Sequence, residues 1–600
     1  MCGIIGVLGD HQAAPIMVDA LRRLEYRGYD SAGIATVRDG VLDRRRAVGK
    51  LVNLADLLVE DPLPGRSGIG HTRWATHGGV TRDNAHPHRT GRVAVVHNGI
   101  IENFQALRDA LGGQWESQTD TETIVRLCDG YLEEGLSPKD AAFATVDRLR
   151  GAYALCFLFE GEPDLLICAR QGPPLAVGHG EGEMFVGSDA IALAGLTDRV
   201  TYLEDGDRAV VTRAGLQVFD AEGRQTHREV RQVRIEARQM EKAGHKHFMA
   251  KEIHEQPQTL KDVLDAYLDG DRIAPPAAFD WSGVERLTIV ACGTAHIAGM
   301  VAKYWFEKIA RLPVECDIAS EYRYRDPVID ARGAVMVISQ SGETADTLAA
   351  LRHAKDAADT LAVVNVAESS IAREAGVAFP IHAGVEVGVA STKAFVNQLA
   401  VLLMLAVRAG LDRGALPPDA EREWAARLGT LPGVLSLALS VEERSEALAA
   451  RLAEASDILF LGRGPMYPMA QEGALKLKEI SYIHAEAYAS GELKHGPIAL
   501  VDRTLPVVVF APTDALFDKT VSNMQEVMAR EGRVLLVTDA EGAAAASQGV
   551  WEVLTMPKVD PLLAPIVYAV PAQLLAYHTA VHKGTDVDQP RNLAKSVTVE

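Results

Sequence analysis

A cysteine stands at position 2 of the chain, in the opening run Met1-Cys2-Gly3. If Met1 is removed, Cys2 carries a thiol and a free α-amine on the same residue. A thiol of ordinary pKa is mostly protonated at neutral pH, so a nucleophilic cysteine needs a neighbouring base. An α-amine with a pKa near about 8 can be that base, directly or through one water. The alternative is that Cys2 is a small apolar residue opening a strand over residues 3–8.

Residues 71–78 read His-Thr-Arg-Trp-Ala-Thr-His-Gly, which is too rich in functional side chains for a plain loop. Arg73 offers a planar guanidinium that fits a carboxylate. The alternative is a surface arginine on a turn.

Asn98 and Gly99 follow the apolar run 93–96. An Asn amide beside a Gly N–H makes a suitable oxyanion hole for acyl transfer, whereas the alternative is a simple Asn-Gly turn. Asp120 lies at a predicted helix start, so it either caps the helix or holds a substrate ammonium.

Small hydroxyl residues follow a predicted buried strand at residues 334–338. The run Ser-Gln-Ser-Gly-Glu-Thr at 339–344 precedes a predicted helix, and such a loop forms an anion cradle. No Walker A lysine is present, so a sugar phosphate fits better than a nucleoside triphosphate. Ordinary N-capping is the alternative. A second polar loop, residues 389–393 with Ser391, supports binding of an anion or of sugar hydroxyls.

Glu472, Lys476 and Glu479 lie at i, i+4 and i+7 on a predicted helix, along one face. The alternative is that these three residues form a row of ion pairs exposed to solvent. Downstream, the run 489–497 places His495 in a glycine-bounded loop. A carboxylate base, a lysine and a histidine are what an aldose–ketose isomerisation needs.

The C-terminal tail, residues 584–600, is dense in specific side chains, including Lys595. Chain ends normally fray. This composition therefore indicates that the tail folds into a site.

The length and composition of the chain limit the number of domains and the class of protein that can position these groups. With 600 residues the chain should hold about three domains. Lys+Arg 61 against Asp+Glu 81 gives −20, which argues against general nucleic-acid or anionic-membrane binding. The six cysteines show no zinc-type spacing. No signal segment and no run of about 18 apolar residues is evident, so the protein is predicted to be soluble and cytoplasmic.

Residues 1–230 show short alternating strands with interspersed helices, typical of a layered α+β domain. A polar helical stretch follows, with a hinge predicted at Pro257. The remainder alternates apolar runs with helices, as in parallel α/β sheets. Residues 287–293 and 458–464 each give a strand, a glycine turn and a helix, and a second strand follows about 45 residues later in each copy. A duplicated α/β module is therefore predicted.

Five motifs in one order resemble the class II glutamine amidotransferases: residues 1–4, 26–31, 71–78, 97–99 and 119–122. The resemblance implies an N-terminal-nucleophile enzyme with L-glutamine as substrate. It implies that Cys2 attacks the glutamine amide to give a thioester and ammonia. It also implies that Arg73 binds the α-carboxylate of glutamine and that Asp120 binds its α-amine. Asn98 and Gly99 would stabilise the tetrahedral oxyanion, and Trp74 would close over the site.

The second half is similar to the two sugar isomerase (SIS) domains of the glucosamine-6-phosphate synthase family, and the joint resemblance covers essentially all 600 residues. It implies fructose 6-phosphate as the acceptor and a homodimer with an internal ammonia channel. The implied phosphate and sugar ligands are Thr294, Ser339, Gln340, Ser341, Thr344 and Ser391. The implied catalytic residues are Lys595 at the C2 carbonyl, Glu479 moving the proton between C1 and C2, Lys476 assisting, and His495, from a second subunit, opening the ring.

One departure is Ala295, where the family commonly has serine. The substitution removes a hydroxyl and keeps the backbone N–H, so a weaker or rearranged contact is expected.

Two alternative functions remain: an SIS enzyme or deglycase acting on another sugar phosphate, and a sugar-phosphate-binding regulator. The Cys2 motifs count against the first. The −20 charge and the Glu479/His495 set count against the second.

The expected fold is an α+β N-terminal-nucleophile (αββα) domain followed by two α/β doubly wound, flavodoxin-like SIS domains. The expected boundaries are 1–230 for the glutaminase domain, 231–280 for a linker and helix, 281–425 and 450–585 for the SIS domains, and 586–600 for a tail completing the synthase site. No metal and no organic cofactor is expected.

Overall fold

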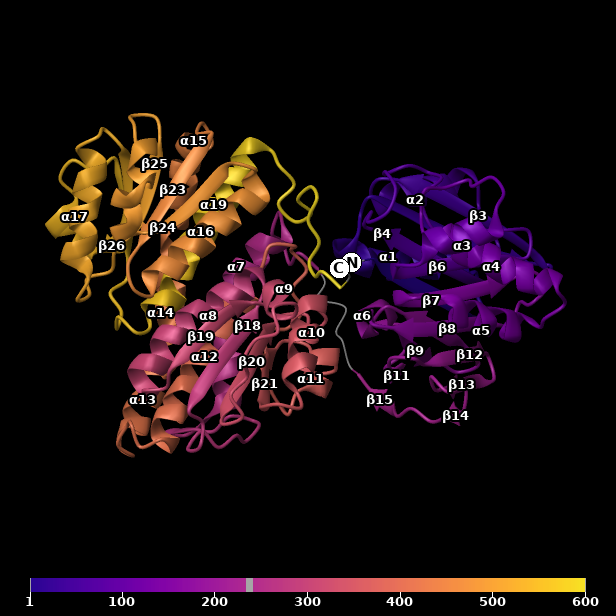
Figure 1. Ribbon diagram of the computed structural model, residues 1–600. Coiled ribbons are helices and arrows are strands. Elements are labelled where there is room, and N and C mark those ends of the chain that lie inside the picture. Colours follow the sequence, from indigo (N-terminus) through magenta and orange to yellow (C-terminus); the bar gives the residue numbers. More distant parts are fainter. Residues whose placement is uncertain (1, 234–240, 599–600) are drawn as a thin grey trace. The chain divides into compact units, whose positions relative to one another are not determined.

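The computed structural model describes residues 2–233 and 241–598, and it divides into two compact units (Figure 1). The first unit is Met1–Glu241 together with Ala594–Glu600, and the second is Lys242–Leu593.

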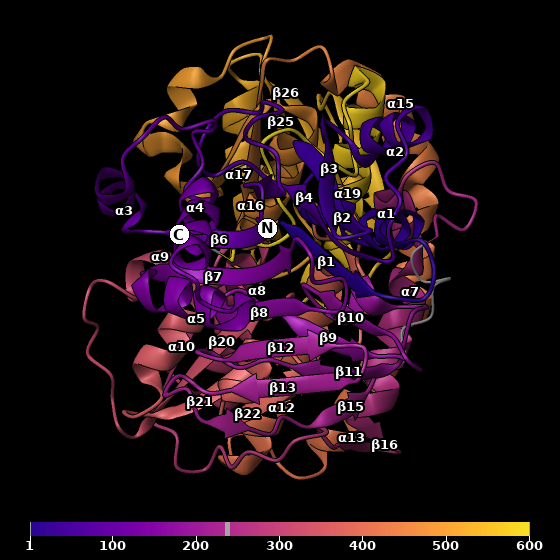
Figure 2. The same ribbon diagram turned by 90° about the vertical axis from the view of Figure 1, so that its right-hand side faces the viewer.

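Two antiparallel sheets form the centre of the first unit, and Figure 2 shows β7, β8, β12 and β13 side by side. The eight-stranded sheet has the order β15 (Val230–Gln232), β11 (Arg199–Tyr202), β9 (Ala176–His179), β10 (Met184–Gly187), β1 (Gly3–Leu8), β4 (Ser67–Arg73), β2 (Ser31–Arg38), β3 (Val41–Val48). The seven-stranded sheet has the order β14 (Gln225–Thr226), β13 (Gly215–Phe219), β12 (Arg208–Thr212), β8 (Leu166–Gln171), β7 (Gly151–Phe159), β6 (Val93–Ile101), β5 (His88–Arg89).

Helices cover the outer faces of both sheets. Apolar residues of the two sheets pack face to face, with Ile4 and Val96 among them. The first sheet packs its other face on α1 (Ala13–Leu24), α2 (Leu51–Glu60) and α6 (Ala190–Leu193). The second packs on α3 (Phe104–Leu111), α4 (Thr121–Glu133) and α5 (Pro138–Arg148). The predicted αββα layering is confirmed. Because β1 is covered on both faces, all six of its residues are apolar or glycine and buried.

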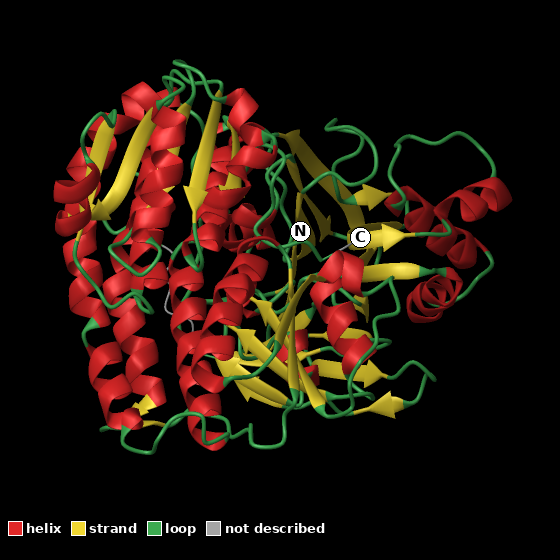
Figure 3. Cartoon of the chain, turned by 60° about the vertical axis from the view of Figure 1, so that its left-hand side comes forward, coloured by secondary structure: helices red, strands yellow, loops and turns green. Residues whose placement is uncertain are grey.

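The second unit contains two five-stranded parallel sheets flanked by helices (Figure 3). The first has the order β19 (Val314–Ile318), β18 (Arg286–Ala291), β20 (Gly333–Ser339), β21 (Asp359–Val364), β22 (Val377–Pro380). The second has the order β24 (His484–Ala489), β23 (Asp457–Gly462), β25 (Pro506–Phe510), β26 (Arg533–Asp539), β27 (Glu552–Met556). In both sheets the first strand of the module lies between the second and the third, which is the flavodoxin-like order. The predicted duplication is therefore confirmed.

The helices of the second unit cover both faces of each sheet. Around the first sheet lie α8 (Gly293–Trp305), α9 (Ala319–Tyr322), α10 (Ala345–Ala354), α11 (Ser370–Glu374) and α12 (Lys393–Asp412). Around the second lie α16 (Met466–Ser481), α17 (Phe517–Met528), α18 (Ala540–Ala546) and α19 (Ala564–Lys583). The remaining helices are α7 (Phe248–Tyr267), α13 (Ala420–Gly429), α14 (Leu431–Ala438) and α15 (Glu442–Leu452), and β16 (Leu268–Asp269) pairs with β17 (Arg272–Ile273).

Two helical stretches are long and apolar enough for a membrane span by length and composition, Lys393–Asp412 and Ala420–Leu452. The expectation that the chain lacks such a run is therefore wrong. The first stretch is α12, and 89% of its most apolar 18-residue window is buried inside the protein, as in a core helix of a folded domain. Its Asn397 amide donates to the carbonyls of Thr259 and Ile381.

The hinge predicted at Pro257 is wrong, because α7 runs through this residue. Proline has no N–H, so the Ile253 carbonyl loses its helical donor. The Gln256 side-chain amide donates to that carbonyl instead, at 2.9 Å, and Gln256 is fully buried. The helix continues because a side chain replaces the missing backbone donor.

Replacing Gln256 by methionine should lower stability by about 1–3 kcal/mol, because a buried carbonyl loses its only side-chain donor. For a unit of this size we expect the midpoint of thermal unfolding to fall by at least about 2 °C. The control is Gln258→Met, since Gln258 is on the same helix and its bond to Asp262 is exposed. Equal midpoints for the two variants would contradict this account of α7.

Candidate active sites

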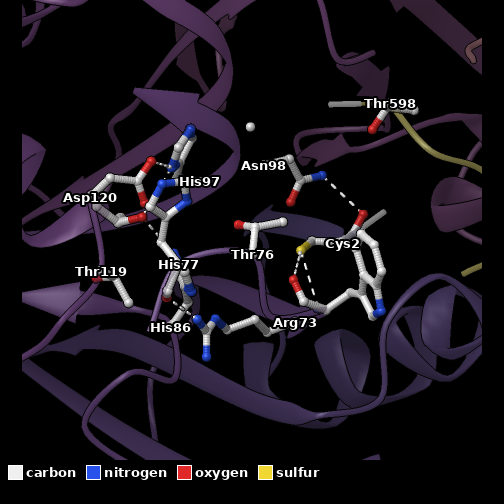
Figure 4. A pocket seen from close by; sticks show the side chains of 13 residues that line it. Cys2, Arg73, Thr76, His77, His86, His97, Asn98, Thr119, Asp120 and Thr598 are labelled. Atoms are coloured by element: carbon white, nitrogen blue, oxygen red, sulfur yellow. Dashed lines mark hydrogen bonds and ion pairs between the residues drawn. The ribbon is translucent and has the colours of Figure 1, made fainter. Parts of the chain in front are cut away.

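The Cys2 thiol lies against the backbone of Trp74, at the point where β1 pairs with β4 (Figure 4). The Trp74 N–H donates to Sγ at 3.3 Å, and the thiol donates to the Trp74 carbonyl at 3.5 Å. Burial raises the pKa of the Cys2 thiol, and the Trp74 N–H and the charge of Arg73 oppose this shift. The thiol is therefore protonated at rest, and its use as a nucleophile requires a base.

A pocket opens beside this thiol and contains most of the residues predicted for the first site. Its lining is Cys2, Arg73, Trp74, Thr76, His77, His86, His97, Asn98, Gly99, Thr119, Asp120, Thr121 and Thr598. The structure thus brings together Cys2, Arg73, Trp74, Asn98, Gly99 and Asp120. Thr598 belongs to the terminal segment that groups with the first unit.

Asn98 and Gly99 lie inside β6, so the alternative of an Asn-Gly turn is wrong. The Asn98 amide nitrogen donates to the Cys2 carbonyl at 3.0 Å. Gly99 has φ +137°, and a Cβ there would lie 2.0 Å from the Ala152 carbonyl oxygen on β7. Only glycine fits this close approach of two strands.

Arg73 is buried, so the alternative of a surface arginine is wrong. Its guanidinium donates to the carbonyls of His77, Gly78 and Gly79, which fold around it. These bonds fix the planar group at the pocket wall without neutralising its charge.

Asp120 does not cap α4 with its side chain, so that alternative is also wrong. Its carboxylate accepts from the Ile101 N–H at 2.8 Å and lies 3.9 Å from His97 Nδ1. Asp120 therefore presents a buried carboxylate to the pocket.

Four buried histidines surround this pocket, and the sequence reasoning assigned them no role: His71, His86, His88 and His97. The rings of His71 and His86 lie 4.3 Å apart. Burial lowers the pKa of all four, that of His71 to about 3. The high number of histidines between residues 71 and 97 is the sequence feature that could have indicated them.

These histidines should make the first unit acid-labile. The folded state binds fewer protons than the unfolded chain, so their contribution is complete above about pH 6.5 and is lost as the pH falls, by up to about 1.4 kcal/mol per pH unit for each histidine. Urea unfolding of the first unit between pH 7.5 and 5 measures this slope. His88→Leu removes one titrating group and should reduce the slope by that amount. A pH-independent midpoint would overturn the prediction.

In the second unit, the loop 339–344 connects β20 to α10 as predicted. The Ser339 hydroxyl lies 3.1 Å from the Thr344 hydroxyl and accepts from the Gly342 N–H at 3.0 Å. Thr344 makes no side-chain cap bond, so plain N-capping does not describe it. Gly342 has φ +66°, and a Cβ there would lie 1.9 Å from Ser369 Oγ. Gln340, Ser341 and Thr344 are half-buried at this turn.

The loop at 389–393 already holds a carboxylate of the protein. Glu386 accepts from the backbone N–H groups of Thr392 and Ala394 at 2.9 and 3.0 Å, and from the Ser391 hydroxyl at 3.3 Å. Glu386 therefore engages both amides and the hydrogen of the Ser391 hydroxyl, so Ser391 can meet a sugar only as a hydrogen-bond acceptor unless its bond to Glu386 is exchanged.

The Glu472, Lys476 and Glu479 face of α16 is buried or half-buried, so the solvated ion-pair stripe is wrong. Lys476 Nζ lies 2.7 Å from Glu479 and 3.5 Å from Glu472, and it donates to Thr294 Oγ1 at 2.9 Å. Thr294, at the start of α8, donates to Glu472 at 3.3 Å. The two modules of the second unit thus meet at this cluster.

The charges of this cluster are set by burial and proximity. Burial raises the pKa of Glu472 to about 7, although Lys476 opposes this shift. Burial alone would lower the pKa of Lys476, but Glu472 and Glu479 raise it above its ordinary value. Lys476 stays charged, and Glu472, which the predicted site omitted, is poised to gain or lose a proton near neutral pH.

His495 and Lys595 belong to other segments of the chain than α16. His495 is exposed at the end of a short 3₁₀ helix, Ser490–His495. Lys595 is half-buried in the terminal segment that groups with the first unit. Their roles at a sugar stay predictions.

Sequence families and relatives match both units. The SIS domain family matches residues 282–408 and 451–583, and a glutamine amidotransferase domain family matches residues 73–195. The glutamine–fructose-6-phosphate aminotransferases (isomerizing) of Zymomonas mobilis and Brucella abortus are each 56% identical over 607 residues, covering 100% of both chains. The C-terminal domain of glucosamine-fructose-6-phosphate aminotransferase from Francisella tularensis covers 58% of this chain and 100% of its own, with 43% identity and a TM-score of 0.57. The chain therefore belongs to the glutamine–fructose-6-phosphate aminotransferase (isomerizing) family.

Proposed function

We propose that this enzyme makes glucosamine 6-phosphate and glutamate from fructose 6-phosphate and glutamine. The observation that carries the proposal is that one chain contains two unlike sites. The first is a cysteine pocket with an arginine and a carboxylate, and the second is a Glu–Lys–Glu cluster in a unit that also contains a strand–helix hydroxyl loop. The 56% sequence identity to a glutamine–fructose-6-phosphate aminotransferase over the full length of both chains supports both parts of the reaction, the release of ammonia from glutamine and its transfer to the sugar.

At the first site, Cys2 Sγ attacks the side-chain carbonyl carbon of glutamine, with the α-amine of processed Cys2 taking the thiol proton. Arg73 binds the α-carboxylate, Asp120 binds the α-ammonium and Trp74 covers the substrate. Asn98 and Gly99 stabilise the oxyanion. Ammonia leaves as the thioester forms, and water then releases glutamate and restores the thiol.

At the second site, the hydroxyls of Ser339, Ser341 and Thr344, with Gln340, hold the phosphate, and Thr294 and Ser391 contribute to binding the sugar phosphate. Lys595 acts at the C2 carbonyl, where ammonia adds with loss of water. Glu479 removes a proton from C1 and returns it to C2. The pairing of Lys476 with both Glu479 and Glu472 supports proton transfer, because it keeps a cation beside the anion that develops on the sugar.

We further propose the domain division 1–230, 231–280, 281–425, 450–585 and 586–600, a cytoplasmic location and a homodimer in which His495 serves the partner's sugar site. The exposure of His495 supports the last point. We assign no residue to a cofactor or a metal. Within the described residues, no group of three or more histidine, cysteine or acidic side chains is arranged so that it could hold a metal ion.

Complementation tests the shared site. Glu479→Gln and His495→Ala should each be inactive in synthesis, but their co-expression should restore about a quarter of wild-type activity. About half of randomly paired dimers are mixed, and each mixed dimer has one intact site of two. Activity that stays at the level of the separate variants would show that His495 acts within its own chain.

The reaction itself is tested with amide-¹⁵N glutamine and fructose 6-phosphate, followed by mass spectrometry of the processed protein's products. Label in an amino-hexose 6-phosphate is expected. Glutamate without labelled sugar would indicate another acceptor. Turnover of neither substrate would favour a sugar-phosphate-binding regulator.

A further inference from the structure

The amide of Asn98 is held at both ends by buried side chains outside the pocket lining. On the nitrogen side, Nδ2 donates to the Cys2 carbonyl at 3.0 Å and to Ser188 Oγ at 3.1 Å. On the oxygen side, His71 Nε2 lies 2.9 Å from Oδ1. His71 and Ser188 are both fully buried.

These contacts fix which way the amide points. The Cys2 carbonyl can only accept, so the Asn98 nitrogen must face it and the Asn98 oxygen must face His71. His71 Nε2 also lies 3.1 Å from the His97 carbonyl oxygen. Both neighbours of Nε2 are therefore acceptors, and Nε2 must carry the hydrogen.

Ser188 engages the other hydrogen of the amide. Its hydroxyl oxygen also accepts from the Ile4 N–H at 2.7 Å, which ties it to β1, two residues after the nucleophile. With one Nδ2 hydrogen on Ser188, the second bonds to the Cys2 carbonyl oxygen. Nδ2 therefore faces the residue that carries the nucleophile, and an oxyanion forming beside the thiol would share or take over this second hydrogen.

We propose that His71 and Ser188 are positioning residues that lock the Asn98 amide with its N–H toward the nucleophile. This inference rests on the proposed glutaminase function of the site. A flipped amide would turn a carbonyl oxygen toward a developing negative charge and so would raise the barrier. The contribution of His71 and Ser188 is thus realised in the transition state more than in the binding of glutamine.

Loss of the His71 donor should lower kcat and leave the KM for glutamine nearly unchanged. Because loss of an oxyanion donor costs about 10²–10³-fold, we expect His71→Leu to reduce kcat for glutamine hydrolysis by about 10–100-fold, since Asn98 itself remains. His71→Gln, which can place an N–H at the same point, should recover most of it. His88→Leu removes a neighbouring buried histidine that bonds to Thr119, and it should change kcat less than about threefold.

An aldehyde analogue of glutamine separates positioning from general damage. The Cys2 thiol would convert it to a tetrahedral hemithioacetal, so its affinity should fall in His71→Leu by the same factor as kcat/KM. The affinity for glutamate should stay constant. Ser188→Ala should behave similarly, and the double variant should be much less impaired than the product of the two single effects, because both residues act through one amide.

Three outcomes would overturn the proposal while leaving the proposed function intact: unchanged kcat in His71→Leu, no recovery in His71→Gln, or equal weakening of aldehyde and glutamate binding. Failure of the wild-type protein to hydrolyse glutamine would instead reject the function on which the inference rests. Conversion of fructose 6-phosphate to glucose 6-phosphate, followed in every variant, reports the integrity of the second unit.

Discussion

Replacing Cys2 by alanine is expected to abolish glutamine-dependent synthesis while conversion of fructose 6-phosphate to glucose 6-phosphate continues. Loss of a nucleophile from an acyl-transfer site costs about four orders of magnitude or more in kcat. The proposed sugar chemistry uses groups of the second unit, such as Glu479 and Lys476, which the substitution does not touch. Coupled assays for glutamate and for glucose 6-phosphate measure the two activities on one sample.

Cys128→Ala is the matched control, because Cys128 is a buried cysteine of the same unit, on α4 and outside the pocket lining. This variant should retain both activities. If Cys2→Ala still released glutamate at the wild-type rate, the nucleophile assignment would be wrong. If it lost isomerisation as well, the two activities could not be assigned to separate sites.

Replacing Lys476 by methionine is expected to lower isomerisation by about 10²–10⁴-fold, the usual contribution of a positioned acid–base group. It should also destabilise the second unit by up to about 3–5 kcal/mol, because a buried carboxylate loses its cation. Glu472 is fully buried beside Lys476, so it becomes the unpaired charge.

The stability loss in Lys476→Met should depend on pH in a defined direction. The pKa of Glu472 is already raised by burial, to about 7, and loss of the cation raises it further. A carboxyl group with a raised folded-state pKa stabilises least at high pH, because the unfolded chain releases its proton first. The variant should therefore be nearer to wild type at pH 6 than at pH 8, as measured by urea unfolding.

Lys478→Met is the control, since Lys478 lies two residues away on α16 and is exposed. It should change neither activity nor stability by more than about 0.5 kcal/mol. Equal stability of Lys476→Met at both pH values would show that Glu472 has another charge partner.

Much of the architecture follows from local sequence patterns. The alternating strands of the first unit, the parallel modules of the second and the duplication at residues 287–293 and 458–464 were all predicted, because strand and helix periodicity is set by residues close in sequence. The order of motifs around Cys2, Arg73 and Asn98 likewise predicted which side chains gather in one pocket.

The alternatives left open by the sequence were decided by partners far along the chain. The spacing of Glu472, Lys476 and Glu479 is the same in a solvated stripe and in a buried cluster. The difference is Thr294, 182 residues before Lys476, which packs against it. Asp120 has the residue type and position of a helix N-cap, yet its carboxylate accepts a hydrogen bond from the Ile101 N–H of a strand. At Pro257 a local rule failed because the neighbouring glutamine supplied the missing donor.

By itself, then, the sequence determined the kinds of element, their order and the family of chemistry. Only the tertiary structure decided burial, hydrogen-bond partners and protonation, such as the neutral state of His71 and the orientation of Asn98. The physical reason is that periodicity and turn preference are local energies. Desolvation and hydrogen-bond pairing instead depend on which distant segments come together, as Asn98 and Ser188 do across 90 residues.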